Sequence, residues 1–315
     1  MDYVIGIDGG STKCLLKAKT LDGRTIATLT GETTNHSIVG KQVAQRRISR
    51  LISSLIKSFD GSMEDCRCIV VGAAGIDSPQ DSLIVETFYD ALQFRCSIFC
   101  MNDGIMALYA ATKGVGVLAI SGTGSIVVGR NAKGKVTRSG GYSITINGDE
   151  GSSRWMSVMA LNHMSKWVDE SVPKTPLVRK MIEHFHGFDA DKLIQCSTAL
   201  YRRPINPELA LLVYDAAKEG DQAAVSIIKR GAEELFKVAQ TVTRKLDFNK
   251  EDGFLSGMWG SVFVNNEFFT DEYRKLFTDQ YPNAKMIFPS GDAADGAAAM
   301  ALDYLNGSID FIDDL

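Results

Sequence analysis

The sequence predicts an α/β fold built of two similar halves, the second of which is richer in helices. The first observation is a hairpin at the amino terminus, in which the apolar runs 3–7 and 14–18 flank a turn at residues 8–13. The second is a similar hairpin at residues 115–129, with its turn at residues 121–125. The third is an alternation of strand-like and helix-like segments, which predicts mixed sheets with helices on their faces.

Periodicity identifies the further elements of the first half. Alternating side chains predict a strand, wholly apolar short runs predict buried strands, and apolar residues at helical spacing predict helices. The expected elements are strands at 25–30, 69–72 and 96–101 and helices at 43–56, 82–92 and 103–112.

The second half restarts this order at Val115 and is expected to be helix-rich from Ser152 onward. Asn206 is a predicted N-cap, followed by a first-turn proline and an acidic residue. The remaining expected elements are helices at 222–245, near 272–279 and at 293–305, and strands at 253–256 and 286–288.

Composition narrows the class of protein. The 315 residues are 45% hydrophobic and 23% charged, which is typical of a globular chain with sizeable cores. A net charge of −4 without clustered lysine and arginine argues against a nucleic-acid or membrane partner. Because the start resembles no signal peptide, we expect a cytoplasmic protein. The six cysteines have no zinc spacing and are expected to be free thiols, with Cys66 and Cys68 on one face of a strand.

The two hairpin turns are the candidate phosphate sites. Glycines leave backbone N–H groups free to face an anion, and Ser11 and Thr12 add hydroxyl donors. Asp8, at the end of a buried strand, would hold a hydrated magnesium ion. Residues 8–13 alone are also compatible with an ordinary tight turn. The second glycine and hydroxyl-rich turn favours two half-molecules that each offer a turn to one polyphosphate.

Three other polar segments are ambiguous when taken singly. Asn102 and Asp103 follow an apolar strand, and they either cap a helix or present a carboxylate at the rim of the sheet. Residues 148–152, which contain Asp149, are either a helix start or a binding loop for hydroxyl groups. Residues 33–37 form a polar loop between a strand and a helix.

Taken together, these motifs resemble the superfamily of sugar kinases, actin and heat-shock ATPases. Within it the chain looks most like the N-acetylglucosamine kinase branch, which is grouped with the activator ATPases of benzoyl-CoA reductase and hydroxyacyl-CoA dehydratase. The resemblance rests on residues 8–13, 35–36, 72–75, 102–103, 121–125, 140–141 and 148–152, and more thinly on 255–263 and 296–298.

The resemblance implies two ribonuclease H-like domains of the actin-like ATPase type around an ATP cleft. The expected domains are 1–113 and 114–291, and residues 292–315 would form a closing helix that returns to the first domain. The implied cofactors are ATP and Mg²⁺, with Asp8 as the metal residue. The ATP site would comprise Gly9, Gly10, Ser11, Thr12, Lys13, Gly122, Thr123, Gly124, Ser125 and Gly257.

The resemblance also implies the reaction: transfer of the γ-phosphoryl group of ATP to the 6-hydroxyl of N-acetylglucosamine, with Asp103 as the base. The sugar site would comprise Asn35, His36, Ala73, Ala74, Asn102, Asp103, Gly140, Gly141 and Asp149. The branch further implies a homodimer.

Two departures from the family pattern keep alternatives open. Tyr142 replaces the usual tryptophan, and the segment 140–147 is one residue longer than usual before Gly148, so N-acetylmuramic acid or glucosamine are rival acceptors. Met258 and Trp259 interrupt the double glycine of the adenosine motif, which leaves the nucleotide preference open. An activator ATPase is disfavoured, because the glycine loops lack cysteines to hold a shared iron–sulfur cluster. A transcriptional sugar sensor would need a basic helix-turn-helix, which the sequence does not show.

Overall fold

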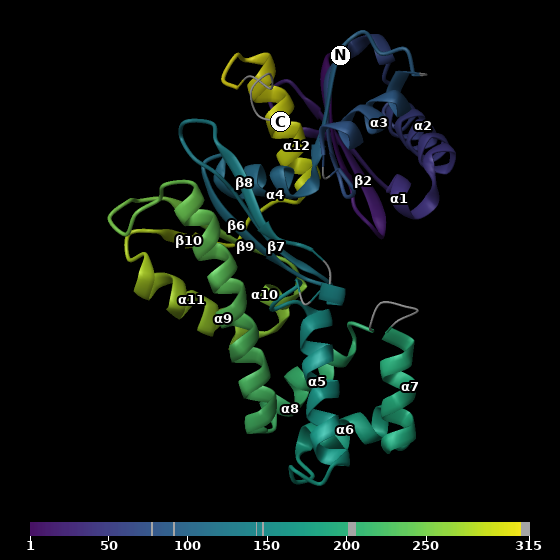
Figure 1. The fold of residues 1–315 in the computed structure, drawn as a ribbon. Helices are drawn as coiled ribbons and strands as arrows, with labels where there is room; N and C mark the ends of the chain where they lie inside the picture. Colours follow the sequence, from purple (N-terminus) through teal and green to yellow (C-terminus); the bar gives the residue numbers. More distant parts are fainter. Residues whose placement is uncertain (77, 91, 143, 147, 201–205, 310–315) are drawn as a thin grey trace. The chain divides into compact units, whose positions relative to one another are not determined.

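The computed structural model describes residues 1–76, 78–90, 92–142, 144–146, 148–200 and 206–309. The chain forms two compact units, each built around strands and helices (Figure 1). Unit 1 comprises Met1–Leu118, Gly129–Val136 and Ile287–Leu315, and unit 2 comprises Ala119–Val128 and Thr137–Met286. The predicted α/β class is confirmed, whereas the predicted domain boundaries at 113 and 291 stay a prediction.

The first sheet has five strands in the order β3-β2-β1-β4-β5. The predicted amino-terminal hairpin is confirmed, because β1 and β2 pair antiparallel from Tyr3 with Thr20 to Gly9 with Cys14. Strands β4 and β5 continue the sheet parallel to β1, so the sheet is mixed. Its strands are β1 (Tyr3–Gly9), β2 (Lys13–Thr20), β3 (Thr25–Glu32), β4 (Cys66–Ala73) and β5 (Ser97–Asn102).

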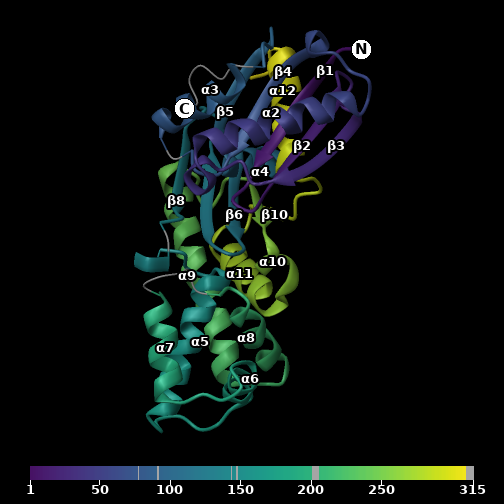
Figure 2. The ribbon, with the colours of Figure 1, turned by 90° about the vertical axis from the view of Figure 1, so that its right-hand side faces the viewer.

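Helices cover both faces of this sheet. Figure 2 shows α2 in front of the strands and α12 behind them. The helix α12 packs directly on β1 because Gly6 carries no side chain, and Gly296 allows the same helix to approach α4. The helices of unit 1 are α1 (His36–Val39), α2 (Lys41–Lys57), α3 (Pro79–Asp90), α4 (Asp103–Thr112) and α12 (Ala293–Leu305), with a short 3-10 turn at Met63–Asp65.

A β-bulge interrupts β4 near its start. Tyr3 pairs with Cys66 and the next residue, Val4, pairs with Cys68, so Arg67 is an extra residue in β4. Tyr3 and Cys66 belong to the buried cluster beneath α2, whereas Val4 and Cys68 do not. The expectation that Cys66 and Cys68 share a face is therefore wrong, since a bulge shifts the alternation of side chains by one residue.

The second sheet has the order β10-β9-β6-β7-β8. The predicted second hairpin is present as the neighbouring strands β6 and β7. The strands are β6 (Gly116–Ser121), β7 (Ser125–Arg130), β8 (Val136–Gly140), β9 (Leu255–Trp259) and β10 (Lys285–Ile287).

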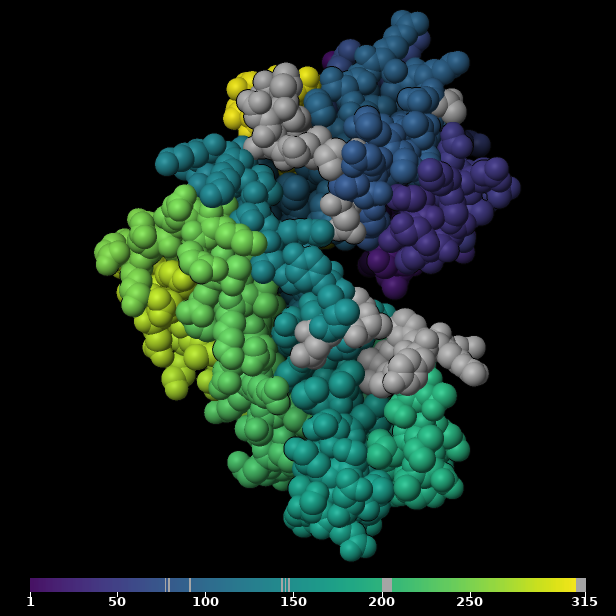
Figure 3. Space-filling view, in the orientation of Figure 1, coloured from purple at the N-terminus to yellow at the C-terminus, as the bar shows by residue number. Residues whose placement is uncertain are grey.

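Unit 2 is helix-rich, as predicted. The helix α9 lies on the surface of unit 2 in Figure 3. The apolar side of this helix, which includes Leu235 and Phe236, is buried. Aromatic rings of Phe236, Tyr273 and Phe277 meet edge to face or tilted in the core beneath it. The helices are α5 (Ser153–Val168), α6 (Pro176–His184), α7 (Ala190–Leu200), α8 (Leu209–Lys218), α9 (Gln222–Lys245), α10 (Ser261–Asn265) and α11 (Glu267–Gln280), with a 3-10 turn at Ile144–Ile146.

The predicted start of α8 is wrong by two residues. Glu208, not Asn206, is its N-cap, because Pro207 and Glu208 form a tight turn in which Ala210 N donates to Pro207 O at 3.2 Å. Asn206 Oδ1 instead accepts from Glu208 N at 2.9 Å. Among the helices that the structure describes, none combines the length and apolar character needed to cross a membrane.

Candidate active site

Three of the predicted segments end side by side at one edge of the first sheet. Gly9 of β1 pairs with Ala73 of β4, and Ala73 pairs with Asn102 of β5. All three strands are parallel, so their carboxyl ends meet at this edge, which is where open α/β sheets bind ligands. Asp8 lies one residue before this edge, and Asp103 is the first residue of α4.

The turn after β1 is held in place by its carbonyl groups. Thr33 Oγ1 donates to Gly10 O at 2.8 Å, and Ala74 N donates to Gly9 O at 2.9 Å. The exposed Ser11 and Thr12, by contrast, donate their backbone N–H groups to no acceptor among the described residues. Lys13 follows as the first residue of β2. The turn therefore offers donors and a cation to an anion, as the sequence predicts.

The loops at 33–37 and 72–75 adjoin this turn. Asn35 caps α1 by accepting from Ser37 N at 3.0 Å, and His36 begins that helix. Gly75 has φ 93°, and a Cβ there would lie 3.0 Å from Asn35 Oδ1. On the other side, Asn102 Nδ2 donates to Ile76 O at 2.9 Å. Unit 1 therefore brings together the predicted sugar-side residues Asn35, His36, Ala73, Ala74, Asn102 and Asp103.

Negative charge is concentrated beside the first turn. Burial raises the pKa of Asp8 to about 6, and the carboxylates of Asp103 and Asp292 add to this shift, while Lys13 opposes it. A site with this excess of negative charge fits a divalent cation. Mg²⁺ in particular takes one or two carboxylates and completes its shell with water and phosphate oxygens.

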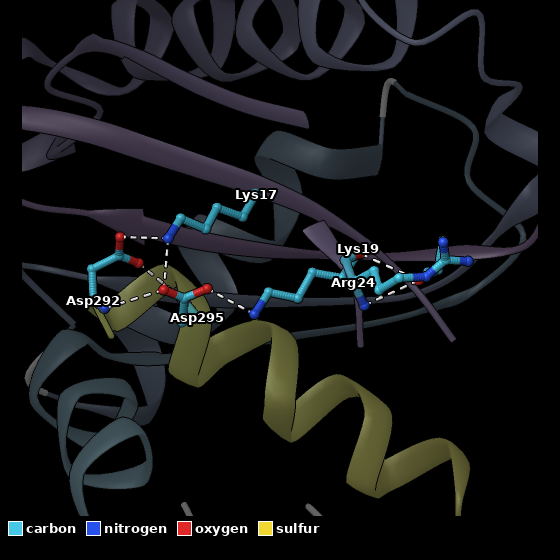
Figure 4. A network of polar contacts seen from close by, with 6 residues as sticks. Lys17, Lys19, Arg24, Asp292 and Asp295 are labelled. Carbon is cyan, nitrogen blue, oxygen red and sulfur yellow. Dashed lines mark hydrogen bonds and ion pairs between the residues drawn. The ribbon is translucent and has the colours of Figure 1, made fainter. Parts of the chain in front are cut away.

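Sequence reasoning missed Asp292 and the charged network that holds it. Lys17 Nζ lies 2.6 Å from both Asp292 Oδ2 and Asp295 Oδ2, and Lys19 Nζ lies 2.7 Å from Asp295 Oδ1 (Figure 4). Burial alone would raise the pKa of Asp295, but hydrogen bonds from Lys17 and Lys19 lower it to about 2. The available signal was the spacing of Asp292 and Asp295, which form a capping box at the start of α12.

In unit 2, the turn of residues 121–125 packs on the segment that leads into α5. Ser121 Oγ donates to Gly151 O at 2.9 Å, and Ser125 Oγ donates to Glu150 O at 2.7 Å. Ser153 N donates to Gly122 O at 2.9 Å. Thr123 and Gly124 donate their N–H groups to no acceptor among the described residues. This second turn thus has the same donor-rich character as the first.

Of the remaining predicted residues of unit 2, Asp149 and Gly140 adjoin this turn. Asp149 is buried, and its Oδ1 accepts from Ser125 N at 3.3 Å. Gly140 ends β8, and Gly141 follows it with φ 74°. Gly257 lies within β9. After that strand, Gly260 packs so closely that a Cβ there would lie 2.2 Å from Ser121 O.

Arg154 is a second residue that sequence reasoning missed. It is the second residue of α5, and its backbone N donates to Thr123 O at 3.3 Å. Its Nε is buried and has no hydrogen-bond partner among the described residues. A cation at the amino end of a helix is disfavoured by the helix dipole. In the sequence, the only indication of Arg154 was its position at the start of a predicted helix, just after the glycine-bounded loop 148–152.

Comparison with known proteins identifies the family. The pattern of the BadF/BadG/BcrA/BcrD ATPase family matches residues 5–301. The chain belongs to this family. It is 32% identical over 306 residues to an N-acetylmuramic acid/N-acetylglucosamine kinase of Clostridium acetobutylicum, covering 96% of this chain and 98% of the relative. It is 29% identical over 315 residues to an N-acetyl-D-glucosamine kinase of Dictyostelium discoideum, with the same coverage of 96% and 98%.

Solved structures support the fold of this ATPase. A proposed N-acetylglucosamine kinase of Chromobacterium violaceum superposes with a TM-score of 0.74 at 22% identity, covering 96% of this chain and 99% of the other. A ROK-family glucokinase of Streptomyces griseus, solved with glucose and AMPPNP, gives 0.59 at 15% identity and covers 95% and 98%. The predicted family and its two-domain, actin-like ATPase fold are therefore confirmed, and membership implies the use of ATP. The roles of the individual residues stay predictions.

Proposed function

We propose that the protein is an amino-sugar kinase that transfers the γ-phosphoryl group of ATP to the 6-hydroxyl of N-acetylglucosamine. Two relatives that match nearly the whole chain carry names of amino-sugar kinases. The structural observation that carries the proposal is the shared edge of β1, β4 and β5, where Asp103 and Asp8 adjoin a turn with free N–H donors.

The two hairpin turns and the two carboxylates Asp8 and Asp103 have physical tasks in this reaction. Phosphoryl transfer through a loose transition state is catalysed mainly by alignment and by neutralisation of charge on phosphate oxygens. The N–H groups of Ser11, Thr12, Thr123 and Gly124 supply such donors. Bound Mg²⁺, with Asp8 as its protein ligand, would neutralise further phosphate charge. Asp103 accepts the proton of the sugar hydroxyl.

N-acetylmuramic acid is the second candidate acceptor. The relative from Clostridium acetobutylicum is named for both N-acetylmuramic acid and N-acetylglucosamine. Glucosamine is a third candidate, because a glucosamine kinase of Vibrio cholerae is 27% identical over 242 residues, covering 76% of this chain and 80% of the relative. We expect a cytoplasmic homodimer, and sedimentation at several protein concentrations tests the dimer.

A coupled ADP-release assay ranks the acceptors. The panel comprises N-acetylglucosamine, N-acetylmuramic acid, glucosamine, N-acetylmannosamine and glucose, and we expect the highest kcat/KM with N-acetylglucosamine. Phosphorus NMR of the product then locates the ester. The phosphorus of a 6-phosphate couples to both protons of a methylene group, whereas a 1-phosphate couples to the single anomeric proton. ADP release that no sugar stimulates would refute a sugar kinase.

Asp103→Asn tests the base. Loss of a general base lowers kcat by about a hundred- to ten-thousand-fold, while calorimetric binding of ATP should persist. Asp191→Asn is the matched control, because Asp191 is an exposed carboxylate in the first turn of another helix, α7. Normal turnover in the Asp103 variant would remove this residue from the mechanism.

A further inference from the structure

Two thiols lie side by side at the end of the first sheet opposite to the candidate active site. Cys66 begins β4, and Cys96 directly precedes β5. The two strands are parallel neighbours. We propose that Cys66 and Cys96 are a peroxide-sensitive dithiol that closes to a disulfide between these strands. This inference is independent of the proposed kinase reaction.

The β-bulge at Arg67 brings the two thiols onto the same face. Ile69 of β4 pairs with Ile98 of β5, and both belong to the core beneath α2. Cys96 precedes Ile98 by two residues and therefore points to that side, where it packs against the same core. Without the bulge, Cys66 would point to the other face. The extra residue returns Cys66 to the core that Cys96 also contacts, just before the first β4–β5 pair, Cys68 with Ser97.

The spacing of neighbouring strands suits a disulfide. Adjacent strands lie about 4.8 Å apart, and disulfides span Cα separations of about 4.4–6.8 Å. The Cys66 and Cys96 thiols lie close enough for each to shift the pKa of the other. We therefore expect closure to occur mainly by rotation of the two side chains.

The two thiols differ in a way that assigns their roles. The neighbouring Cys66 thiol and the charge of Arg67 both act to lower the pKa of Cys96, against a raising effect of burial. Cys96 is also only partly buried, whereas Cys66 is buried. Because Cys96 is the more accessible of the two, it is the thiol that a peroxide reaches first, and Cys66 is the resolving thiol.

The chemistry balances with a hydroperoxide as the oxidant. The Cys96 thiolate attacks one peroxide oxygen, the O–O bond breaks, and Cys96 becomes a sulfenic acid while hydroxide leaves. The Cys66 sulfur, after losing its proton, then attacks the sulfenic sulfur and displaces a second hydroxide. Overall, two thiols and one hydrogen peroxide give one disulfide and two waters, and a dithiol reductant reverses the change.

Other cysteines lack this arrangement. Cys14, Cys68 and Cys100 are buried. Cys68 is near Cys96, but it lies outside the core cluster that holds Cys66 and Cys96. Cys196 is partly exposed on α7 in unit 2, so it reports non-specific oxidation.

Tryptic peptides of the native protein test the proposal directly. Cleavage after Lys57, Arg67, Arg95 and Lys113 places Cys66 in residues 58–67, Cys68 in 68–95, and Cys96 in 96–113. After hydrogen peroxide treatment, non-reducing mass spectrometry should show peptide 58–67 linked to peptide 96–113, with loss of two hydrogen atoms. Fragmentation should place the link on Cys96 rather than on Cys100. Dithiothreitol should release both peptides.

Two variants separate the two oxidation steps, and a third variant serves as the control. Cys66→Ser should leave a sulfenic acid on Cys96 that dimedone traps, and Cys96→Ser should give no linked peptide and no adduct on Cys66. Cys196→Ser should form the link as the wild type does. Peptides 58–67 and 96–113 that stay unlinked at a peroxide dose that oxidises Cys196 would overturn the proposal. So would a link from 58–67 to 68–95.

Discussion

Gly6 lies in the middle of β1, where α12 crosses the sheet, and it offers a sharp test of how the first unit is packed. A Cβ at this position would lie 2.2 Å from Ala294 O and 2.4 Å from Ala298 N. These opposing atoms belong to the backbone of α12, so no side chain can rotate away. The change Gly6→Ala must therefore displace the helix or the strand.

The helix has little room to yield. On its other side, a Cβ at Gly296 would lie 2.2 Å from Met106 O, which shows how closely α12 also approaches α4. Overpacking a core costs about 1–3 kcal/mol when neighbouring groups adjust. Because backbone confines α12 on both sides, we expect Gly6→Ala to lower the free energy of unfolding by about 3 kcal/mol, the upper end of this range.

Urea unfolding followed by circular dichroism measures this loss. Gly253→Ala is the matched control, because the atom nearest to a Cβ there is Asn283 O at 3.8 Å, an ordinary contact. The control should retain the stability of the wild type. If Gly6→Ala unfolds within about 0.5 kcal/mol of the wild type, the range of ordinary surface changes, the close packing of α12 on β1 is refuted.

Three further changes test other contacts. The pKa of Asp295 is about 2, below its ordinary value of 3.8, so the ionised carboxylate stabilises the fold above pH 3.8, and this stabilisation is lost as the pH falls toward 2. In the wild type the loss in free energy of unfolding is about 2 kcal/mol. Lys17→Met should make this loss smaller when unfolding is measured from pH 4 to pH 2. Asp221→Ala removes the N-cap of α9 and the acceptor for a buried N–H of α6. The free energy of unfolding, measured with urea or heat, should fall by about 2–4 kcal/mol. An unchanged unfolding midpoint would contradict this. Gly75→Ala should weaken binding of the sugar in calorimetry, because φ is 93° and the new Cβ meets the cap of α1. The control Gly23→Ala is strained at φ 88°, but its Cβ makes only an ordinary contact with Leu302 at 3.9 Å, so it should bind the sugar normally.

The elements with strong local signals could be predicted from the sequence. The helices at 222–245 and 293–305 were predicted with the bounds observed for α9 and α12, because their apolar or small residues repeat at helical spacing. The hairpin turns were also predicted, since glycine and hydroxyl residues between apolar runs signal them directly. The predicted strand at 253–256 begins two residues too early, because Gly253 lies outside the ladder of β9.

Contacts between distant segments could not be predicted in this way. The ion pair of Lys17 with Asp292 depends on where α12 crosses β2. No local sequence pattern predicts the position of this crossing. The bulge at Arg67 likewise depends on the register between β1 and β4. The sequence therefore indicated the residues along the carboxyl edge of the sheet, but not the ion pairs of Lys17 and Lys19 with Asp292 and Asp295.

The return of α12 to the first unit also has a consequence for protein synthesis. The residues that cover β1 include Ala294 and Ala298, which leave the ribosome long after β1 itself. Until then one side of β1, which is apolar from Tyr3 to Ile7, has no permanent cover, although the intervening chain is free to fold. Nascent chains stalled before residue 293 should therefore recruit chaperones to their first segment, and extension through residue 305 should release them.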